Sequence, residues 1–561
     1  MQSFSRGWSF LKQAWGMAFK DKDLLKPSVY ALVVGMIVSV IGIIPLAIAY
    51  FAFSGSSVGN FVLAIMGGIL IFVQFVVTYI FSGMTVYLIY GYLSEGDGRM
   101  DKAWAIVKRD FFDILTLAAV STVVNMLKSA AQRNRKNNIV SGLMRSATGL
   151  LETLWTEAAY LILPAMVIDA LPGLSQDCVP YKKPLANGAP GHGCGHNLLG
   201  VAGLAACMAI KQAMDMGEVK GMIKYFGCPA EEGGGGKAFM ANAGVFKDVD
   251  ICLTWHPDMF NGTLYANFLA NYRVSFKFHG KTAHAAADPF NGRSALDAVE
   301  LMNVGVNYLR EHMIPDARVH YVIINGGGIA PNVVPAEAES LYSVRAPRTD
   351  QLDALFERVK NIAKGAALMT GTELDIVVHS GMSNMLLNET INEILQSKLN
   401  EVGAPKFNSE EHAFARELSK SIPADSLETS AYVYGLDSKA VAALKGIVLY
   451  EDILPPFKSE IVLPGSTDVG DVSWVVPTGQ IFTTCWALGS PGHSWQIVAQ
   501  GSMGIGQRGM LYAGKVMALS AVEFMQNDKV REQAKTEFKQ KRAAANYISP
   551  IPPGTKPPLN I

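Results

Sequence analysis

The sequence carries no net charge, because 48 basic side chains balance 48 acidic ones. Without an excess of either sign, no global field attracts the chain to nucleic acid, and we expect no nucleic-acid partner. Cysteine is scarce: there are six, none lies in the first 177 residues, and their spacing is irregular. This excludes a disulfide framework and indicates a reducing compartment for the part that contains them. The N-terminus also lacks the pattern of a cleavable signal peptide.

Apolar residues are abundant instead, and their excess lies near the N-terminus. They make up 50% of the chain, and the mean hydropathy is +0.21. Residues Tyr30–Phe53 form an almost unbroken apolar run, longer than the ~20 residues that a helix needs to cross a bilayer. Residues Val58–Tyr92 carry no charge and could form one tilted helix or two short ones. We expect both runs to span a membrane, whereas Ile114–Met126 and Leu154–Ile168 leave both possibilities open.

The basic residues favour one orientation in the membrane. Four lysines precede the first run, which predicts a cytoplasmic N-terminus, and two spans would return the chain to the cytoplasm. If Ile114–Met126 also crossed, the basic loop at 128–145 would lie outside, against this rule, so an interfacial position is the alternative. We expect a multi-pass membrane protein with the following domain in the cytoplasm, although the side on which residue 169 emerges stays open.

The pattern changes at residue 169, where glycine- and proline-rich turns begin to alternate with short apolar segments. A helix is predicted over 198–217, a strand that runs into a loop over 222–232, and another strand over 249–257, an alternation typical of a layered α/β domain. Between 272 and 379 the predicted order β-α-β-β-α-β is that of a ferredoxin-like α+β unit. The expected divisions are a membrane-spanning helical region at 1–168, an α/β domain in two parts at 169–263 and 385–545, an inserted domain at 264–384, and a proline-rich tail at 546–561.

A short glycine-rich motif, HGCGH at 192–196, could bind a metal. Cys194 and His196 offer a thiolate and an imidazole, which are strong ligands for zinc-like ions. The flanking glycines would let the backbone approach an ion without a Cβ clash. The alternative is a buried cysteine and a surface histidine on a glycine turn.

Three further segments offer carboxylates and imidazoles. Glu231 and Glu232 follow a predicted strand, so one could bind a metal while the other takes a proton from water. His256 ends a predicted strand in TWHPD, and His493 follows an apolar strand in SPGHSWQ. Each signal is weak alone, because a solvated acidic turn and structural histidines are the more common explanations.

Their order is specific. The segments GHGCGHNLLG, PAEEGGGG, LTWHP, GKTAHAA, STDVGDVSW and PGHSWQ resemble the two-metal aminoacylase and carboxypeptidase superfamily over about residues 169–561. Within it, the chain most resembles the family formed by the B-type subunits of aminobenzoyl-glutamate hydrolase. The resemblance implies an α/β two-metal peptidase domain with a layered mixed sheet, and an inserted ferredoxin-like dimerisation and lid domain. It also implies two divalent ions, zinc or manganese, held by Cys194, His196, Glu232, His256 and His493.

The resemblance implies further roles. Glu231 would be the general base, and Asp169, in IDALPG, would support the metal centre from behind its ligands. His284 would reach the active site of the partner in a dimer and stabilise the developing oxyanion. Asn332 and Arg345 would hold the carboxylate of the substrate, although a turn cap and an exposed strand-end charge are their ordinary explanations.

The expected function is hydrolysis of the amide bond of N-acyl or N-aroyl amino acids, aminobenzoyl-glutamate-like compounds among them, or of dipeptides. The partner would be a second copy or a related A-type subunit. Relatives carry a longer segment before the IDALPG motif, which here is replaced by a region that resembles small bacterial membrane proteins of unknown function. The first strands of the sheet would then be missing. The alternative is therefore a membrane protein fused to an inactive hydrolase-derived domain.

Overall fold

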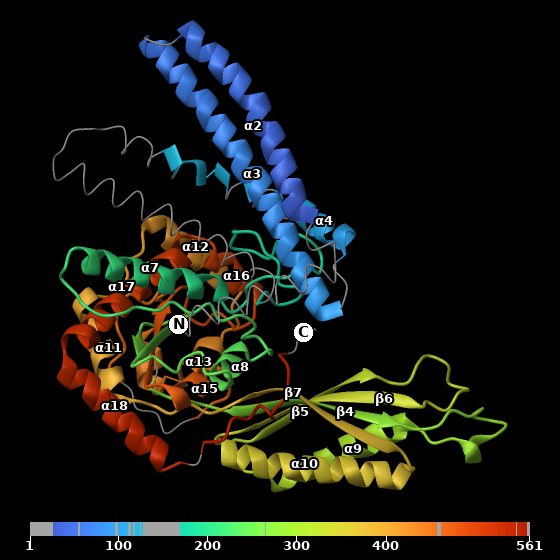
Figure 1. The fold of residues 1–561 in the computed structure, drawn as a ribbon. Coiled ribbons are helices and arrows are strands. Elements are labelled where there is room, and N and C mark those ends of the chain that lie inside the picture. Colours follow the sequence, from blue (N-terminus) through green and yellow to red (C-terminus); the bar gives the residue numbers. More distant parts are fainter. Residues whose placement is uncertain are drawn as a thin grey trace. The chain divides into compact units, whose positions relative to one another are not determined.

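The computed structural model describes residues 26–53, 56–95 and 99–109, parts of 111–126, and 169–557 apart from 264, 433, 457–461 and 546. The chain forms two compact units, which adjoin in sequence at Pro164 and Ala165. The first holds the apolar helices near the N-terminus (Figure 1), and the second holds the predicted site residues.

Two long helices dominate the first unit. Helices α2 (Lys26–Phe53) and α3 (Ser57–Glu95) are long and apolar enough to cross a membrane. The second apolar run is thus one continuous helix rather than two. Between the helices, Gln74 Nε2 donates to the carbonyl oxygen of Gly35 at 2.9 Å and to Ser39 Oγ at 2.6 Å. Most other side chains of α2 are apolar and exposed, Phe51 to 85%, which a lipid environment would cover.

The first unit continues with helix α4 (Met100–Arg109) and helical residues within 111–126. Tyr79 and Ser121 share a hydrogen bond of 2.7 Å, and Ala118 is buried against the same cluster. The weaker run Ile114–Met126 is therefore partly covered by protein. The run Leu154–Ile168 lies outside the described residues.

The body of the second unit has a mixed sheet with the order β1-β9-β2. Strand β9 (Thr478–Thr484) pairs in parallel with β1 (Cys252–Asp258) and antiparallel with β2 (Gly262–Thr263). Helices α7 (His196–Asp215), α11 (Glu389–Val402) and α17 (Gly504–Gln526) bury their apolar residues in the same core. Helix α7 is apolar enough to span a membrane, but its buried face packs on α17, so it is a core helix.

The prediction of a strand within residues 222–232 is wrong. Residues 222–230 form no strand, and no backbone hydrogen bond joins them to another strand in the described part of the chain. Some of their side chains still pack on the body: the ring centroids of Phe226 and Phe246 lie 4.9 Å apart, and Ile223 packs against the main core. A strand needs a hydrogen-bonded neighbour, and the apolar pattern cannot provide one.

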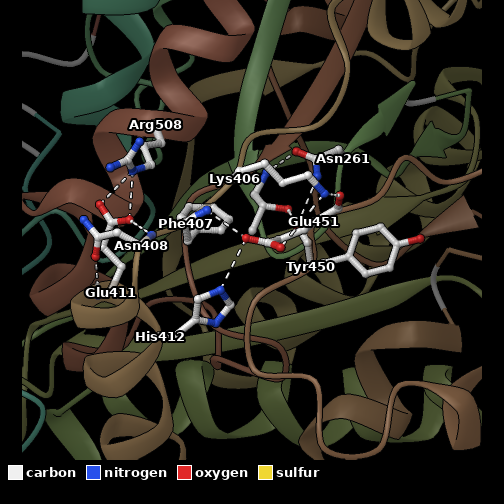
Figure 2. A network of polar contacts seen from close by, with 10 residues as sticks. Asn261, Lys406, Phe407, Asn408, Glu411, His412, Tyr450, Glu451 and Arg508 are labelled. Carbon is white, nitrogen blue, oxygen red and sulfur yellow. Dashed lines mark hydrogen bonds and ion pairs between the residues drawn. The ribbon is translucent and has the colours of Figure 1, made fainter.

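A network of hydrogen bonds and ion pairs connects helix α12 (Ser409–Ser419) to the rest of the body (Figure 2). Both carboxylate oxygens of Glu411 accept from Arg508 Nε of α17 at 2.8 Å, and one accepts the backbone N–H of Asn408 at 2.7 Å. Glu451 accepts the backbone N–H of Phe407 at 2.7 Å. The remaining elements of the body are short helices and strands around the sheet, with α18 at the C-terminal side: α8 (Gly236–Asn242), β3 (Asn267–Phe268), α13 (Ser426–Tyr432), α14 (Ser438–Ala443), β8 (Val462–Leu463), α15 (Val469–Val475), α16 (Trp495–Gly501) and α18 (Asp528–Ala543).

The inserted domain has a four-stranded antiparallel sheet of order β5-β6-β4-β7, and α9 and α10 cover one face of it (Figure 1). Phe276, Phe278 and Tyr342 are fully buried between the sheet and these helices. The β-α-β-β-α-β prediction is confirmed. The elements are β4 (Ala270–His279), α9 (Ala295–Leu309), β5 (Arg318–Asn325), β6 (Glu337–Ala346), α10 (Thr349–Thr370) and β7 (Glu373–Met382).

Candidate metal centre

The HGCGH loop ends at the first residue of α7 and lies against the end of β1. Gly195 caps the helix at φ 74°, and a Cβ there would lie 2.8 Å from the side chain of Pro257. Only glycine allows this close, left-handed approach. As a result, Cys194 Sγ lies 3.6 Å from Nε2 of His256 on β1, although 62 residues separate them in sequence.

Two residues at the site have an unusual backbone. Among the described residues, Ala230 at φ 61° and His493 at φ 54° are the non-glycine residues with positive φ. Ala230 directly precedes the two glutamates, and the backbone N–H of His493 donates to the carbonyl oxygen of Gly193 at 3.0 Å. Such strain costs about 1–3 kcal/mol and is found mostly at functional sites.

Six predicted residues converge. His196 Nε2 lies 3.6 Å from Glu231 Oε2, and its Nδ1 lies 3.9 Å from Glu232 Oε1. The imidazole of His493, which is partly exposed, has its Nε2 at 3.5 Å from the same oxygen of Glu232. Three sets have ligand atoms within 4.8 Å of one another: Cys194, His196 and His256; Cys194, Glu232 and His493; and His196, Glu231 and Glu232.

These donors fit divalent cations. His196 Nδ1 and Glu232 Oε1 are buried and have no hydrogen-bond partner, a costly arrangement unless something else binds them. These two atoms lie 3.9 Å apart, which is too far for a hydrogen bond between them but is compatible with two ligand atoms around a shared ion. Sulfur, imidazole nitrogen and carboxylate oxygen are the donors that zinc-like ions take in proteins.

The electrostatics favour a cation as well. Burial, and then the charge of Asp468, raises the pKa of Glu231 to about 8. Burial and the two glutamates raise the pKa of the Cys194 thiol well above its usual range, while burial lowers the pKa of His196 well below its own. By themselves these groups favour their neutral forms, and bound cations would favour the thiolate and carboxylate forms.

Asp169 lies behind the cluster. Its side chain is buried, and burial raises its pKa, while Lys237 and the backbone N–H groups of Glu232 and Glu231 oppose that rise. One carboxylate oxygen thus faces the backbone of the two glutamates, and Oδ1 has no partner. This location is compatible with the supporting role predicted for Asp169.

The other three predicted residues lie in the inserted domain and contact none of these six in the described part of the chain. His284 is exposed, and its Nδ1 accepts the backbone N–H of Ala287 at 3.2 Å. Asn332 is close in the fold, because its carbonyl oxygen accepts the N–H of Ala285 at 3.0 Å. Arg345, on β6, donates to Ser343 Oγ at 3.1 Å and is half-buried. This chain alone does not bring them to the cluster.

Sequence reasoning missed an ion pair beside the glutamates. Lys237 Nζ lies 2.8 Å from Oδ1 of Asp468, whose side chain is fully buried. Asp468 lies in the motif STDVGDVSW and Lys237 directly follows the motif PAEEGGGG, but neither received a role. Their pairing could not be predicted from the sequence, because they lie 231 positions apart and neither segment indicates an ion pair with the other.

Known proteins resemble this chain at several levels. The model for the peptidase dimerisation domain matches residues 269–369. The B-type subunit of p-aminobenzoyl-glutamate hydrolase from Escherichia coli (strain K12) is 43% identical over 395 residues, covering 69% of this chain and 82% of the relative. Xaa-Arg dipeptidase of Mus musculus is 37% identical over 206 residues, covering 36% and 47%.

Two further comparisons are weaker. The A-type subunit of the same Escherichia coli (strain K12) hydrolase is 29% identical over 265 residues, which is 45% of this chain and 60% of the relative. The solved structure of the aminobenzoyl-glutamate utilization protein from Klebsiella pneumoniae is 20% identical and covers 58% of this chain and 67% of that chain. The TM-score of that comparison is 0.36.

Proposed function

The chain belongs to the M20 peptidase family, and we propose that the part from Asp169 onward hydrolyses the amide bond of N-acyl or N-aroyl amino acids. The observation that carries the proposal is the convergence of Cys194, His196, Glu232, His256 and His493 from four separate segments. The first candidate substrate is p-aminobenzoyl-glutamate, because the relative with 43% identity is named as a hydrolase of this compound. Dipeptides are the second class, from the name of the Xaa-Arg dipeptidase.

The five residues would hold two divalent ions, zinc or manganese, which supply a polarised water and a Lewis acid at the substrate carbonyl. Glu231 would move the proton, and the position of its carboxylate beside the proposed ligand His196 supports this role. It accepts a proton from the attacking water and returns it to the leaving nitrogen. Burial raises the pKa of Glu231 when no ion is bound, and bound cations would lower it again, so that the carboxylate form is present to accept the proton.

Substrate recognition belongs to the inserted domain. Arg345 can bind both oxygens of a substrate carboxylate through its planar guanidinium, and Asn332 adds an amide to the same task. His284 stabilises the oxyanion in the neighbouring protomer. Its exposure, and its separation from the cluster of its own chain, support a contribution across a dimer.

The partner is a second copy of the chain or a related A-type subunit. Strand β5 supports this, because it lies at the edge of its sheet and exposes Val322 to 55%, Ile323 to 42% and Ile324 to 55%. An exposed apolar edge strand is a template for pairing with another chain. The match of the peptidase dimerisation domain covers this strand.

The apolar helices would anchor the enzyme to a membrane with the hydrolase part in the cytoplasm. Support comes from the length and exposed apolar surface of α2 and α3, and from Lys12, Lys20 and Lys22 ahead of them. The six cysteines are free thiols in the structure, which suits a reducing compartment.

The test is metal content and hydrolysis by the full-length chain purified in detergent. We expect about two zinc or manganese ions per chain and release of p-aminobenzoate that a chelator abolishes. An inactive fusion is the rival, and the three-stranded sheet with the unpaired segment 222–230 is the feature that favours it. A folded protein with no bound metal and no turnover would establish that rival.

A further inference from the structure

The glycine loop after the two glutamates is fixed at its far end by one carboxylate. Asp468, directly before α15, accepts from Lys237 Nζ through Oδ1 and from the backbone N–H of Lys237 through Oδ2, both at 2.8 Å. Lys237 lies in the first turn of α8, just after Gly233–Gly236. The two ends of the loop also lie close together, because a Cβ at Gly236 would lie 2.0 Å from the carbonyl oxygen of Pro229.

The inserted domain holds the same loop from the other side. The carbonyl oxygen of Gly233 accepts from Arg273 of β4 at 3.3 Å and from Ser380 Oγ of β7 at 3.2 Å. Gly233 directly follows Glu232. The proposed base Glu231 and the proposed metal ligand Glu232 are thus followed by a residue that the inserted domain binds.

Helix α15 joins these two attachments. Three residues after Asp468, Asp471 accepts the backbone N–H and the hydroxyl of Ser383, each at 2.9 Å. Trp474 Nε1 donates to the carbonyl oxygen of Asn384 at 2.6 Å. Residues 383 and 384 follow β7, where the chain leaves the inserted domain, so one short helix contacts both that exit and the anchor of the glycine loop.

We propose that Lys237 and Asp468 are positioning residues. Their buried ion pair holds Glu231 and Glu232 at a fixed position relative to the inserted domain. The inference rests on the proposed function for its catalytic meaning, but the mechanical link does not need it. A buried ion pair is weak evidence for stability, since its desolvation cost offsets much of its attraction. The effect of this pair is instead on position: Asp468 binds both the side chain and the backbone N–H of Lys237, and these two hydrogen bonds fix the end of the loop.

Hydrogen exchange of the metal-free, full-length protein in detergent tests the mechanical link. In K237M and D468N, amides of residues 231–240 should exchange about tenfold faster or more, whereas K237R should stay near the wild type. S380A should also speed exchange in this loop. The matched control is R508M, which breaks the Arg508–Glu411 pair of Figure 2 and should affect only α12. Unchanged exchange at 231–240 in K237M, D468N and S380A would overturn the proposal.

Zinc binding and turnover test the catalytic meaning. K237M should bind zinc about 10- to 100-fold more weakly in competition with a chelator, the usual effect of losing a group behind the ligands. Its kcat should fall more than its KM changes, and K237R should recover part of both. A wild type without zinc binding or activity would remove the proposed function, while faster exchange in K237M would still support the link. An active wild type with K237M equal to it in zinc affinity and kcat would remove the inference alone.

Discussion

The inserted domain and the body that carries the candidate metal centre both contain β-sheets, but only the sheet of the inserted domain is completed by neighbouring segments of the chain. Its four strands and two helices lie within residues 270–382, and every strand finds its partner there. The main sheet of the body has three strands, and residues 222–230 pair with no strand in the described part of the chain. Local completeness is what made the inserted domain predictable, whereas the body depends on segments far apart in sequence.

The largest difference between the two regions is expected from a substitution in the body. E231Q removes the proposed base and should lower kcat by about 10²- to 10⁴-fold. Because glutamine keeps the size of the side chain, zinc content should stay at the wild-type level. Steady-state hydrolysis of p-aminobenzoyl-glutamate, with metal analysis of the same sample, measures both. Full activity in E231Q would assign the proton transfer to another group.

The inserted domain should respond through stability rather than chemistry. Phe276 is fully buried between the sheet and its helices, so F276A should cost about 3–5 kcal/mol. We expect exchange to rise across 270–382 while β1 and β9 keep their protection. An equal loss of protection in both regions would show that they unfold as one, and the distinction between them would no longer hold.

Arg345 connects the two regions through the substrate. R345A should lower kcat/KM about 10- to 100-fold for free-acid substrates, because it removes a charge-assisted pair. Substrates amidated at that carboxylate should lose little, and they serve as the internal control. Equal losses on both kinds of substrate would remove the recognition role.

The smallest effect concerns the contact between the regions. Burial raises the pKa of Asp471 to about 7, above its usual 3.8, so the folded state keeps a proton that the unfolded state has lost. Its contribution to stability is therefore most favourable below about pH 4 and falls as pH rises to 7. In D471N this slope should disappear, and unfolding free energies at pH 5, 6 and 7 should differ from the wild type by roughly 1 kcal/mol per unit in slope. Parallel profiles would contradict the assignment.

The sequence was informative wherever a pattern is local. Period-two alternation in YRVSFKFHG and the helix after Asp350 were found within a few residues of β4 and α10. The apolar runs of α2 and α3 were equally clear, although the unbroken length of α3 was not. The failure at 222–232 has a physical cause, because a strand is defined by a neighbour that the segment itself does not contain.

For the site, residue types and order identified the cluster, but only folding assembled it. Cysteine, histidine and glutamate are common metal ligands, and the order of their segments resembles a metal-dependent family, so Cys194, His256 and His493 could be named from the sequence. Lys237 and Asp468 could not, since a lysine and an aspartate are ordinary surface residues until burial pairs them. His284, Asn332 and Arg345 were named as well, yet this chain leaves them away from the cluster.

The local structures, the apolar helices and the kinds of donor atom available follow from the sequence alone. They depend on backbone geometry and side-chain chemistry, which act over a few residues. The tertiary structure alone decided that His196 lies within 4 Å of both glutamates, that Gly233 is bound by β4 and β7, and that Asp468 holds Lys237. Such contacts join residues tens to hundreds of positions apart, and their energies appear only when the packed core excludes water from between them.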